Sequence, residues 1–506
     1  MTLGQELANG VSRALEPSGI GQKPIAAHCC GSSEPGPVST VSTVSTVSTV
    51  STVSNSALKI SDPSLRPTQT IGVPDRDSFQ NDAEYRAFVE RILSDYNIRL
   101  GVAKRQQLGY PIYHARDNVE ELDLTPLDRF AASYINNVGD PFESTGAFAS
   151  HSHGFEVGVL QWFANLFSLQ DFWGYCSSGG SESNLEALFI ARENLPTACT
   201  FVSREAHFSV FKALRVLRMP HVVIDCDEQT GEILYDELEQ ALKSSPYRHA
   251  IVVATCGTTM RGAIDSPRRI VDSLRRSGIT KHFLHVDAAL SGIYVPLLDS
   301  HILDFAHVPI SSIAVSGHKF LGVPIPCGAF LVRKTFVENM ASDNVQYIRS
   351  NDLPMSCSRN GLAPLYLWLM LSELGCQRIK ADAIRCIKFA REMTDTLNAA
   401  GIEAHLNPMS ITVVIKDGVD DDFARAWQLA TTGDICHVVV MPHIRKEVLS
   451  QFCEAIIDHQ SRDKSVYGKA MKRLGQAQLS PTCLRTLSIE ERLEQGATEH
   501  HEDSVS

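Results

Sequence analysis

The chain has 506 residues, 43% of them hydrophobic and 21% charged, which is enough for two or three domains with a sizeable core. Its net charge of -12 argues against a nucleic-acid partner, because phosphate binding needs a clustered basic face and the sequence has no such cluster. The 13 cysteines include no C-x-x-C pair, which argues against a metal site or a disulfide framework and favours a reducing compartment.

The two ends of the chain have no pattern that would build a core. Residues 38–54 repeat V-S-T with a period of three, which matches neither the helical period of 3.6 nor the strand period of 2. We therefore expect residues 1–60 to be disordered, and also the polar, acidic residues 478–506. No apolar run approaches the roughly 18 residues that cross a bilayer, so we expect a soluble, cytoplasmic protein.

The middle of the chain alternates short apolar runs with helix-length segments. The runs are rich in β-branched residues and lie at 200–202, 222–225, 250–254, 283–286, 313–315 and 329–332. Strands separated by helices pair in parallel, in a sheet that is covered on both faces. This part of the sequence predicts an α/β domain.

The pattern changes after residue 370. A long helix at 371–399 is followed by strands at 403–406 and 410–415, a helix at 421–430, a strand at 435–440 and a helix at 445–459. We therefore expect a helical arm at 61–110, a large domain at 111–370 and a smaller α+β domain at 371–477.

The first candidate site is a turn of small residues ahead of an apolar helix, in YCSSGGSESNLEALF (175–189). The main-chain N–H groups of Gly180, Ser181 and Glu182, with the Ser181 hydroxyl, can bind a phosphate at such a helix start. A serine-capped turn would explain the same residues.

Two further candidates follow predicted strands directly. Asp287 ends the strand in FLHVDAA, where ligands bind in open α/β sheets, and it could keep a ring nitrogen protonated; the alternative is a loop-capping aspartate. Lys319, in SGHKFLG, is a nucleophile if it is shielded from water and an ordinary surface charge if it is not. Ser316 and His318 beside it would reach the phosphate.

His207, Thr258 and Thr259 complete the set. The His207 ring could lie over a planar cofactor, although a capping or core histidine is the alternative. Thr258 and Thr259 follow a buried strand, and either hydroxyl could donate to a phenolic oxygen, or both could simply belong to a turn.

In their chain order these residues resemble the pyridoxal-phosphate enzymes of the aspartate-aminotransferase fold, fold type I. Within that fold they are most similar to the group II amino-acid decarboxylases of the histidine/serine branch. The resemblance covers about residues 110–461 and is carried by INNVGDPF (135–142), HSHGFEVGVLQWFA (151–164), SREAHFSVFKALR (203–215), GTTMRGAID (257–265), HVDAALSG (285–292), SGHKFLGVPIPCG (316–328) and SRNGLAPLYLW (358–368).

The resemblance implies a mostly parallel sheet in the large domain, pyridoxal 5'-phosphate as cofactor, and a homodimer with active sites at the subunit interface. It implies that Lys319 forms the Schiff base, that Asp287 pairs with the pyridine nitrogen and that His207 stacks on the ring. The phosphate contacts that it implies are Gly180, Ser181, Ser316 and His318.

The substrate stays open between histidine, serine and an amino acid of secondary metabolism such as ibotenate. The residues before His151, and Leu353, Pro354 and Leu362, depart from the pattern of that branch. Arg359 is a candidate partner for the substrate carboxylate, with a structural salt bridge as the alternative. His151 is a second candidate contact, with a surface or capping position as the alternative. An aminotransferase or carbon–carbon lyase would keep the same lysine and aspartate, and a non-catalytic interaction protein is a third possibility.

Overall fold

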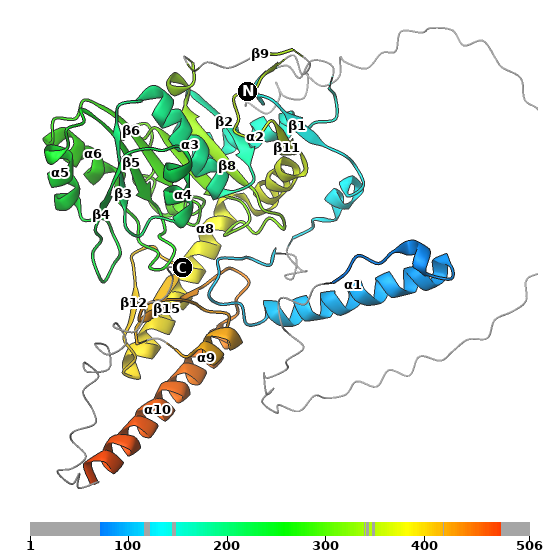
Figure 1. Ribbon diagram of the computed structural model, residues 1–506, viewed down its shortest axis with the longest axis vertical. Coiled ribbons are helices and arrows are strands. Elements are labelled where there is room, and N and C mark those ends of the chain that lie inside the picture. Colours follow the sequence, from blue (N-terminus) through cyan, green and yellow to red (C-terminus); the bar gives the residue numbers. More distant parts are fainter. Residues whose placement is uncertain are drawn as a thin grey trace, which may run out of the picture. The chain divides into compact units, whose positions relative to one another are not determined.

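The computed structural model contains a seven-stranded sheet in the order β2-β8-β7-β6-β5-β3-β4, and most of its strands are labelled in Figure 1. Its strands are β2 (Phe172–Ser177), β3 (Cys199–Ser203), β4 (His221–Ile224), β5 (His249–Thr255), β6 (Lys281–Asp287), β7 (Ser312–Ser316) and β8 (Gly328–Arg333). The structure describes residues 71–115, 122–143, 148–338, 340, 344–346, 350–417 and 419–476, with the side chains of 462–476 left aside. The segments predicted to be disordered, 1–60 and 478–506, lie outside the described residues.

The sheet confirms the predicted α/β fold with mostly parallel strands. All six predicted strands are present within two residues of their expected bounds. The sequence pattern did not reveal β2, nor that β8 runs antiparallel to both β7 and β2. Only residues 317–327 separate β7 from β8, and a parallel return needs a crossover of a dozen residues or more.

Helices cover both faces of the sheet. They are α2 (His153–Leu166), α3 (Gly180–Asn194), α4 (Phe208–Val216), α5 (Tyr235–Ser244), α6 (Pro267–Arg276) and α7 (Val295–Leu298). Along β5, Ile251 and Val253 pack in an apolar cluster with α3 and α4, whereas Val252 and Ala254 pack in a second cluster with α2 and α6. This alternation explains why the strands read as continuous apolar runs.

The C-terminal part contains a second sheet, antiparallel, in the order β12-β13-β15-β14. Its elements are α8 (Leu362–Ala399), β12 (Ala404–Leu406), β13 (Thr412–Ile415), α9 (Asp421–Ala426), β14 (Ala430–Thr432), β15 (Ile435–Val439) and α10 (Lys446–Gln476). The helix expected at 421–430 ends at Ala426 because residues 430–439 form a hairpin, whose turn contains Gly433 at φ +56. The domain bounds remain a prediction.

The remaining elements lie before α2 and between β8 and α8. They are η2 (Arg76–Ser78), α1 (Asp82–Lys104), η4 (Thr125–Phe130), β1 (Asn136–Val138), η5 (Lys334–Phe336), β9 (Asn344–Val345), β10 (Ser350–Asn351) and β11 (Ser358–Asn360). None of the residues of α1 is buried. Of the helices that the structure describes, none has both the length and the apolar character of a membrane span.

Candidate active site

A pocket of about 260 Å³ lies where several strands of the large sheet end. Thr255 ends β5, Asp287 ends β6 and Ser316 ends β7, so three parallel neighbours present polar side chains at one edge. The pocket is lined by Ser178, Gly179, Gly180, Ser181, Glu182, Asn184, His207, Thr255, Gly257, Thr259, Asp287, Ala289, Leu290, Ser316, His318, Lys319 and Pro326. The fold therefore brings together nine of the residues singled out in the sequence.

Lys319 lies in the loop between β7 and β8 and is half-buried. Its ammonium group forms no hydrogen bond or ion pair with any residue that the structure describes. Burial lowers the pKa of Lys319, and the Asp287 carboxylate opposes that shift. A lysine in this environment loses its proton more readily than a surface lysine, which suits a nucleophile.

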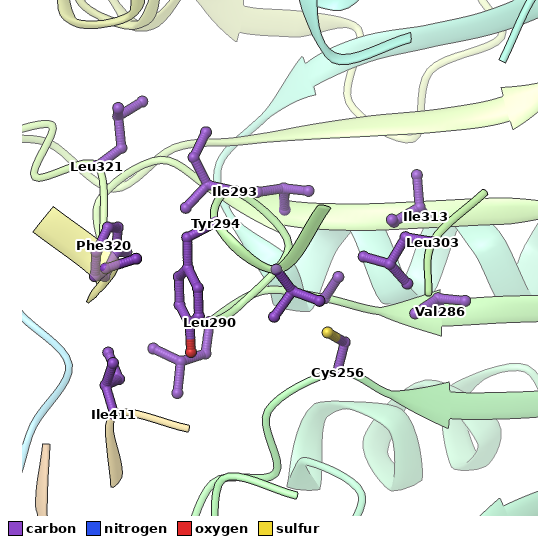
Figure 2. Packing of buried hydrophobic residues seen from close by; sticks show 14 of the residues in the cluster. Cys256, Val286, Leu290, Ile293, Tyr294, Leu303, Ile313, Phe320, Leu321 and Ile411 are labelled. Carbon is purple, nitrogen blue, oxygen red and sulfur yellow. The ribbon is translucent and has the colours of Figure 1, made fainter. Parts of the chain in front are cut away.

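Apolar packing holds the loop that carries Lys319. Phe320, next to the lysine, packs against Tyr294 with 4.8 Å between ring centroids, within the buried cluster of Figure 2. Gly322 has a φ of +77, and a Cβ atom there would lie 2.5 Å from Cδ1 of Tyr113. Glycine is needed at this position for both its backbone conformation and its lack of a side chain.

Asp287 is 4% exposed and accepts two hydrogen bonds inside the protein. Nδ2 of Asn184 donates to Oδ2 at 2.7 Å, and the main-chain N–H of Ala289 donates to Oδ1 at 3.2 Å. These donors fix the plane of the carboxylate at the wall of the pocket. A negative group is thus available to a positively charged ligand atom.

The N-terminus of α3 also lines the pocket. Its N-cap residue, Gly179, provides no side-chain cap, so the first N–H groups of the helix are open to a ligand. The Glu182 carboxylate accepts a hydrogen bond from the Ser178 N–H at 2.9 Å. Ser316 Oγ is buried and has no partner among the described residues, and the same holds for Thr255 Oγ1.

These features fit the cofactor expected from the sequence. Open helix amides and an unpartnered hydroxyl suit a phosphate, a fixed carboxylate suits a protonated ring nitrogen, and a shielded amine suits an aldehyde. The residues that would hold pyridoxal phosphate are therefore present in one pocket.

His207 caps α4 at the side of the pocket. Its Nδ1 accepts a hydrogen bond from the main-chain N–H of Ser209 at 3.3 Å, and burial lowers the pKa of the ring. The two threonines differ in position. Thr259 lines the pocket, whereas Thr258 is fully buried and its Oγ1 accepts the Ala263 N–H at 3.0 Å. Thr258 stabilises a turn, which was the alternative interpretation.

Arg359 lies in the interior and is not among the residues that line the pocket. Its guanidinium forms an ion pair with Glu156, which is fully buried, and donates to the Gly139 carbonyl at 2.8 Å. The structural salt bridge left open by the sequence is therefore what the structure contains. His151 also lies outside the lining, with its ring 4.6 Å from that of His153 between centroids.

The sequence interpretation missed several lining residues, and Asn184 is the most informative of them. It lies four residues after Gly180 in α3, on the same helical face, and it contacts Asp287. That spacing was the signal that could have identified it. Ser178, Thr255 and Pro326 gave no comparable signal.

Comparisons with known proteins match the chain over most of its length. The model of the family described as "Pyridoxal-dependent decarboxylase conserved domain" matches residues 149–414. Serine decarboxylase 1 of Oryza sativa subsp. japonica is 36% identical over 391 residues, which are 77% of this chain and 79% of the relative. Histidine decarboxylase of Mesorhizobium japonicum is 40% identical over 352 residues, 69% of this chain and 92% of the relative.

A comparison of structures finds the same fold. L-methionine decarboxylase from Streptomyces sp. 590 superposes with a TM-score of 0.66 at 22% sequence identity, over 75% of this chain and 95% of that one. At this identity the likeness establishes the fold alone.

Proposed function

The chain belongs to the pyridoxal-dependent decarboxylase family and is a pyridoxal-phosphate-dependent carboxy-lyase, and on this premise we propose that it decarboxylates histidine, serine or a related L-amino acid in the pocket around Lys319. One observation carries the proposal: a shielded amine, a fixed carboxylate and an open anion site line the same pocket. Family membership decides against the aminotransferase, the carbon–carbon lyase and the non-catalytic protein that the sequence left open.

The proposed cofactor contacts divide into three groups. The α3 amides at Gly180, Ser181 and Glu182, with Ser316 Oγ and His318, would hold the phosphate. Asp287 would pair with the ring nitrogen, His207 would stack on the ring and Thr259 would donate to the phenolic oxygen. Lys319 would bind the aldehyde. Lys319, His318 and His207 are the basic side chains of the described lining, so main-chain and hydroxyl donors supply most of the phosphate binding.

Pyridoxal phosphate, when bound, supplies an aldehyde that takes up the substrate amine and a conjugated ring that accepts the electron pair left by departing CO2. The chain contributes orientation and charge. Asp287 keeps a negative charge beside the ring, and its two donors hold it in place. Lys319 would be the amine that holds the cofactor, and its lowered pKa would let Nζ give up and regain a proton at low cost.

The substrate proposal draws on the relatives, which are named as serine and histidine decarboxylases. We also propose that the enzyme works as a homodimer. The apolar side chains of α1 support this, since Leu93, Tyr96 and Ile98 are all more than half exposed. His151 remains a proposed substrate contact.

A panel of amino acids tests the proposal. The purified holoenzyme is incubated separately with histidine, serine, ibotenate and unrelated amino acids, and the amines and CO2 are measured by mass spectrometry. Histamine or ethanolamine should form without any keto acid, and the Lys319→Ala variant should form neither. Turnover of an unrelated amino acid with none of histidine, serine or ibotenate would refute the substrate proposal.

A further inference from the structure

Asn184, in the second turn of α3, is 1% exposed, and one of its hydrogen-bond partners, Asp287, lines the pocket. Its amide nitrogen is 2.7 Å from Asp287 Oδ2 and 3.1 Å from Ser209 Oγ, and its amide oxygen is 2.9 Å from Nε2 of His285. We propose that Asn184 is a positioning residue that holds Asp287 and His207 in one fixed arrangement. The inference rests on the roles proposed above for those two residues.

The direction of each hydrogen bond follows from chemistry. An amide oxygen only accepts, so Nε2 of His285 carries the proton that it donates to Asn184. Burial lowers the pKa of His285 to about 4, so the ring is neutral near pH 7 and its Nδ1 accepts from the Ser312 hydroxyl at 2.9 Å. Ser312 and His285 thus prevent the amide of Asn184 from rotating.

The amide nitrogen then has its two hydrogens directed at two acceptors. One goes to the Asp287 carboxylate and the other to Ser209 Oγ. Since Ser209 Oγ accepts from Asn184, its own hydrogen is free to be donated to Nδ1 of His207, 2.8 Å away. The same Nδ1 receives the Ser209 N–H at 3.3 Å, so the proton of a neutral His207 lies on Nε2.

These hydrogen bonds restrict which atoms of His207 and Asp287 a ligand in the pocket can meet. His207 can present only its ring face and its Nε2–H to a ligand, because Nδ1 is fully engaged inside the protein. Asp287 receives a donor that is itself locked, so the carboxylate cannot turn away from the ring nitrogen. Asn184 therefore fixes the orientation of the Asp287 carboxylate and, through Ser209, the tautomer of His207. It does so without touching the reacting atoms.

A substitution that keeps the shape of Asn184 separates this role from mere packing. Leucine has the same branched arrangement of heavy atoms as asparagine, with two somewhat larger methyl groups, but can neither donate to Asp287 nor accept from His285. The probes are pyridoxal phosphate and its carbocyclic analogue, in which a C–H replaces the ring nitrogen. Equilibrium dialysis of the apoprotein gives the dissociation constant of each, and the ratio of the two reports recognition of the ring nitrogen independently of turnover.

We expect the wild-type protein to prefer pyridoxal phosphate, and Asn184→Leu to lose about tenfold of that preference, as expected for a hydrogen bond to a charged group. Binding of the analogue should change much less. His285→Leu should shift the ratio in the same direction by a smaller factor, and it tests the link without altering Asn184. An unchanged ratio in both folded variants would overturn the proposal.

Two controls complete the experiment. Thr200→Val alters a buried hydroxyl in the same sheet that has no described partner and lies outside this chain of hydrogen bonds, so its ratio should equal that of the wild type. Asp287→Asn should abolish the preference altogether. If Asp287→Asn still prefers pyridoxal phosphate over the analogue, Asp287 does not pair with the ring nitrogen. If Asp287→Asn loses the preference but the Asn184 and His285 variants keep it, Asn184 does not position Asp287 and has only a packing role.

Discussion

Replacing Arg359 by methionine should destabilise the protein while leaving substrate binding intact. The arginine forms an ion pair with Glu156, and the exposed fractions of the two side chains are 4% and 0%. Methionine keeps much of the apolar volume but leaves the carboxylate of Glu156 buried without its cation. Breaking a buried pair from one side is far more costly than losing a surface pair.

The magnitude follows from the contacts. Opposite charges about 4 Å apart attract by about 4 kcal/mol at an effective permittivity of 20. The bond from Arg359 to the Gly139 carbonyl contributes about another 1 kcal/mol. Glu156 keeps donors from Asn137 and from the Cys176 N–H, which offset part of the loss. We expect the free energy of unfolding to fall by about 3–5 kcal/mol.

Urea unfolding followed by fluorescence measures this change, and steady-state kinetics on the active amino acid measures KM. Arg359→Met combined with Glu156→Gln should recover at least half of the lost stability, because the second change removes the unpaired charge. Arg275→Met, which breaks an exposed pair, should have almost no effect. A stable Arg359→Met protein with a KM raised tenfold or more would refute the structural role and restore Arg359 as a substrate contact.

Burial raises the pKa of Glu186 to about 8, so the folded chain keeps this proton where the unfolded chain, with a pKa near 4.5, loses it. The free energy of unfolding should therefore fall as the pH rises from about 4.5 to 8, and melting curves of Glu186→Gln should lack this fall. A melting-temperature difference between variant and wild type that is the same at pH 5 and pH 8 would contradict this prediction. Thr258→Val should lower the free energy of unfolding by about 1–3 kcal/mol and change cofactor affinity little, because Thr258 holds a turn. Thr259→Val should weaken cofactor binding and change stability little, because Thr259 lines the pocket. Equal changes in the cofactor dissociation constant of the two variants, measured by dialysis, would contradict these two roles. Gly322→Ala should lower both the melting temperature and the cofactor content, because its Cβ would overlap an aromatic ring; unchanged cofactor content would show that the Lys319 loop tolerates the shift.

The sequence predicted the parallel strands and the pocket edge because both follow from local rules. A buried parallel strand is a continuous apolar run, and the residue after it lies at the ligand-binding edge of the sheet. Asp287 and Ser316 could therefore be assigned to one edge before the sheet order was known, and Lys319 to the loop just beyond it.

The remaining features depend on contacts between distant segments. Arg359 pairs with Glu156 across 203 residues of chain, and no local pattern separates that pairing from a role in the pocket. Asn184 contacts Asp287 across 103 residues, with only its helical spacing from Gly180 as a clue. The hairpin of β14 and β15 follows α9, and β15 pairs in turn with β13. That pairing is not visible in the local sequence, which has a helix-like pattern.

Borohydride reduction shows which amine of the protein holds the cofactor. Reduction of the holoenzyme fixes the cofactor covalently to the amine that holds it, and mass spectrometry of the peptides then locates the added pyridoxyl group. We expect a single modified peptide that carries the group on Lys319, and no modification in Lys319→Ala. The group on another lysine, or on none, would contradict the assignment of this pocket as the active site.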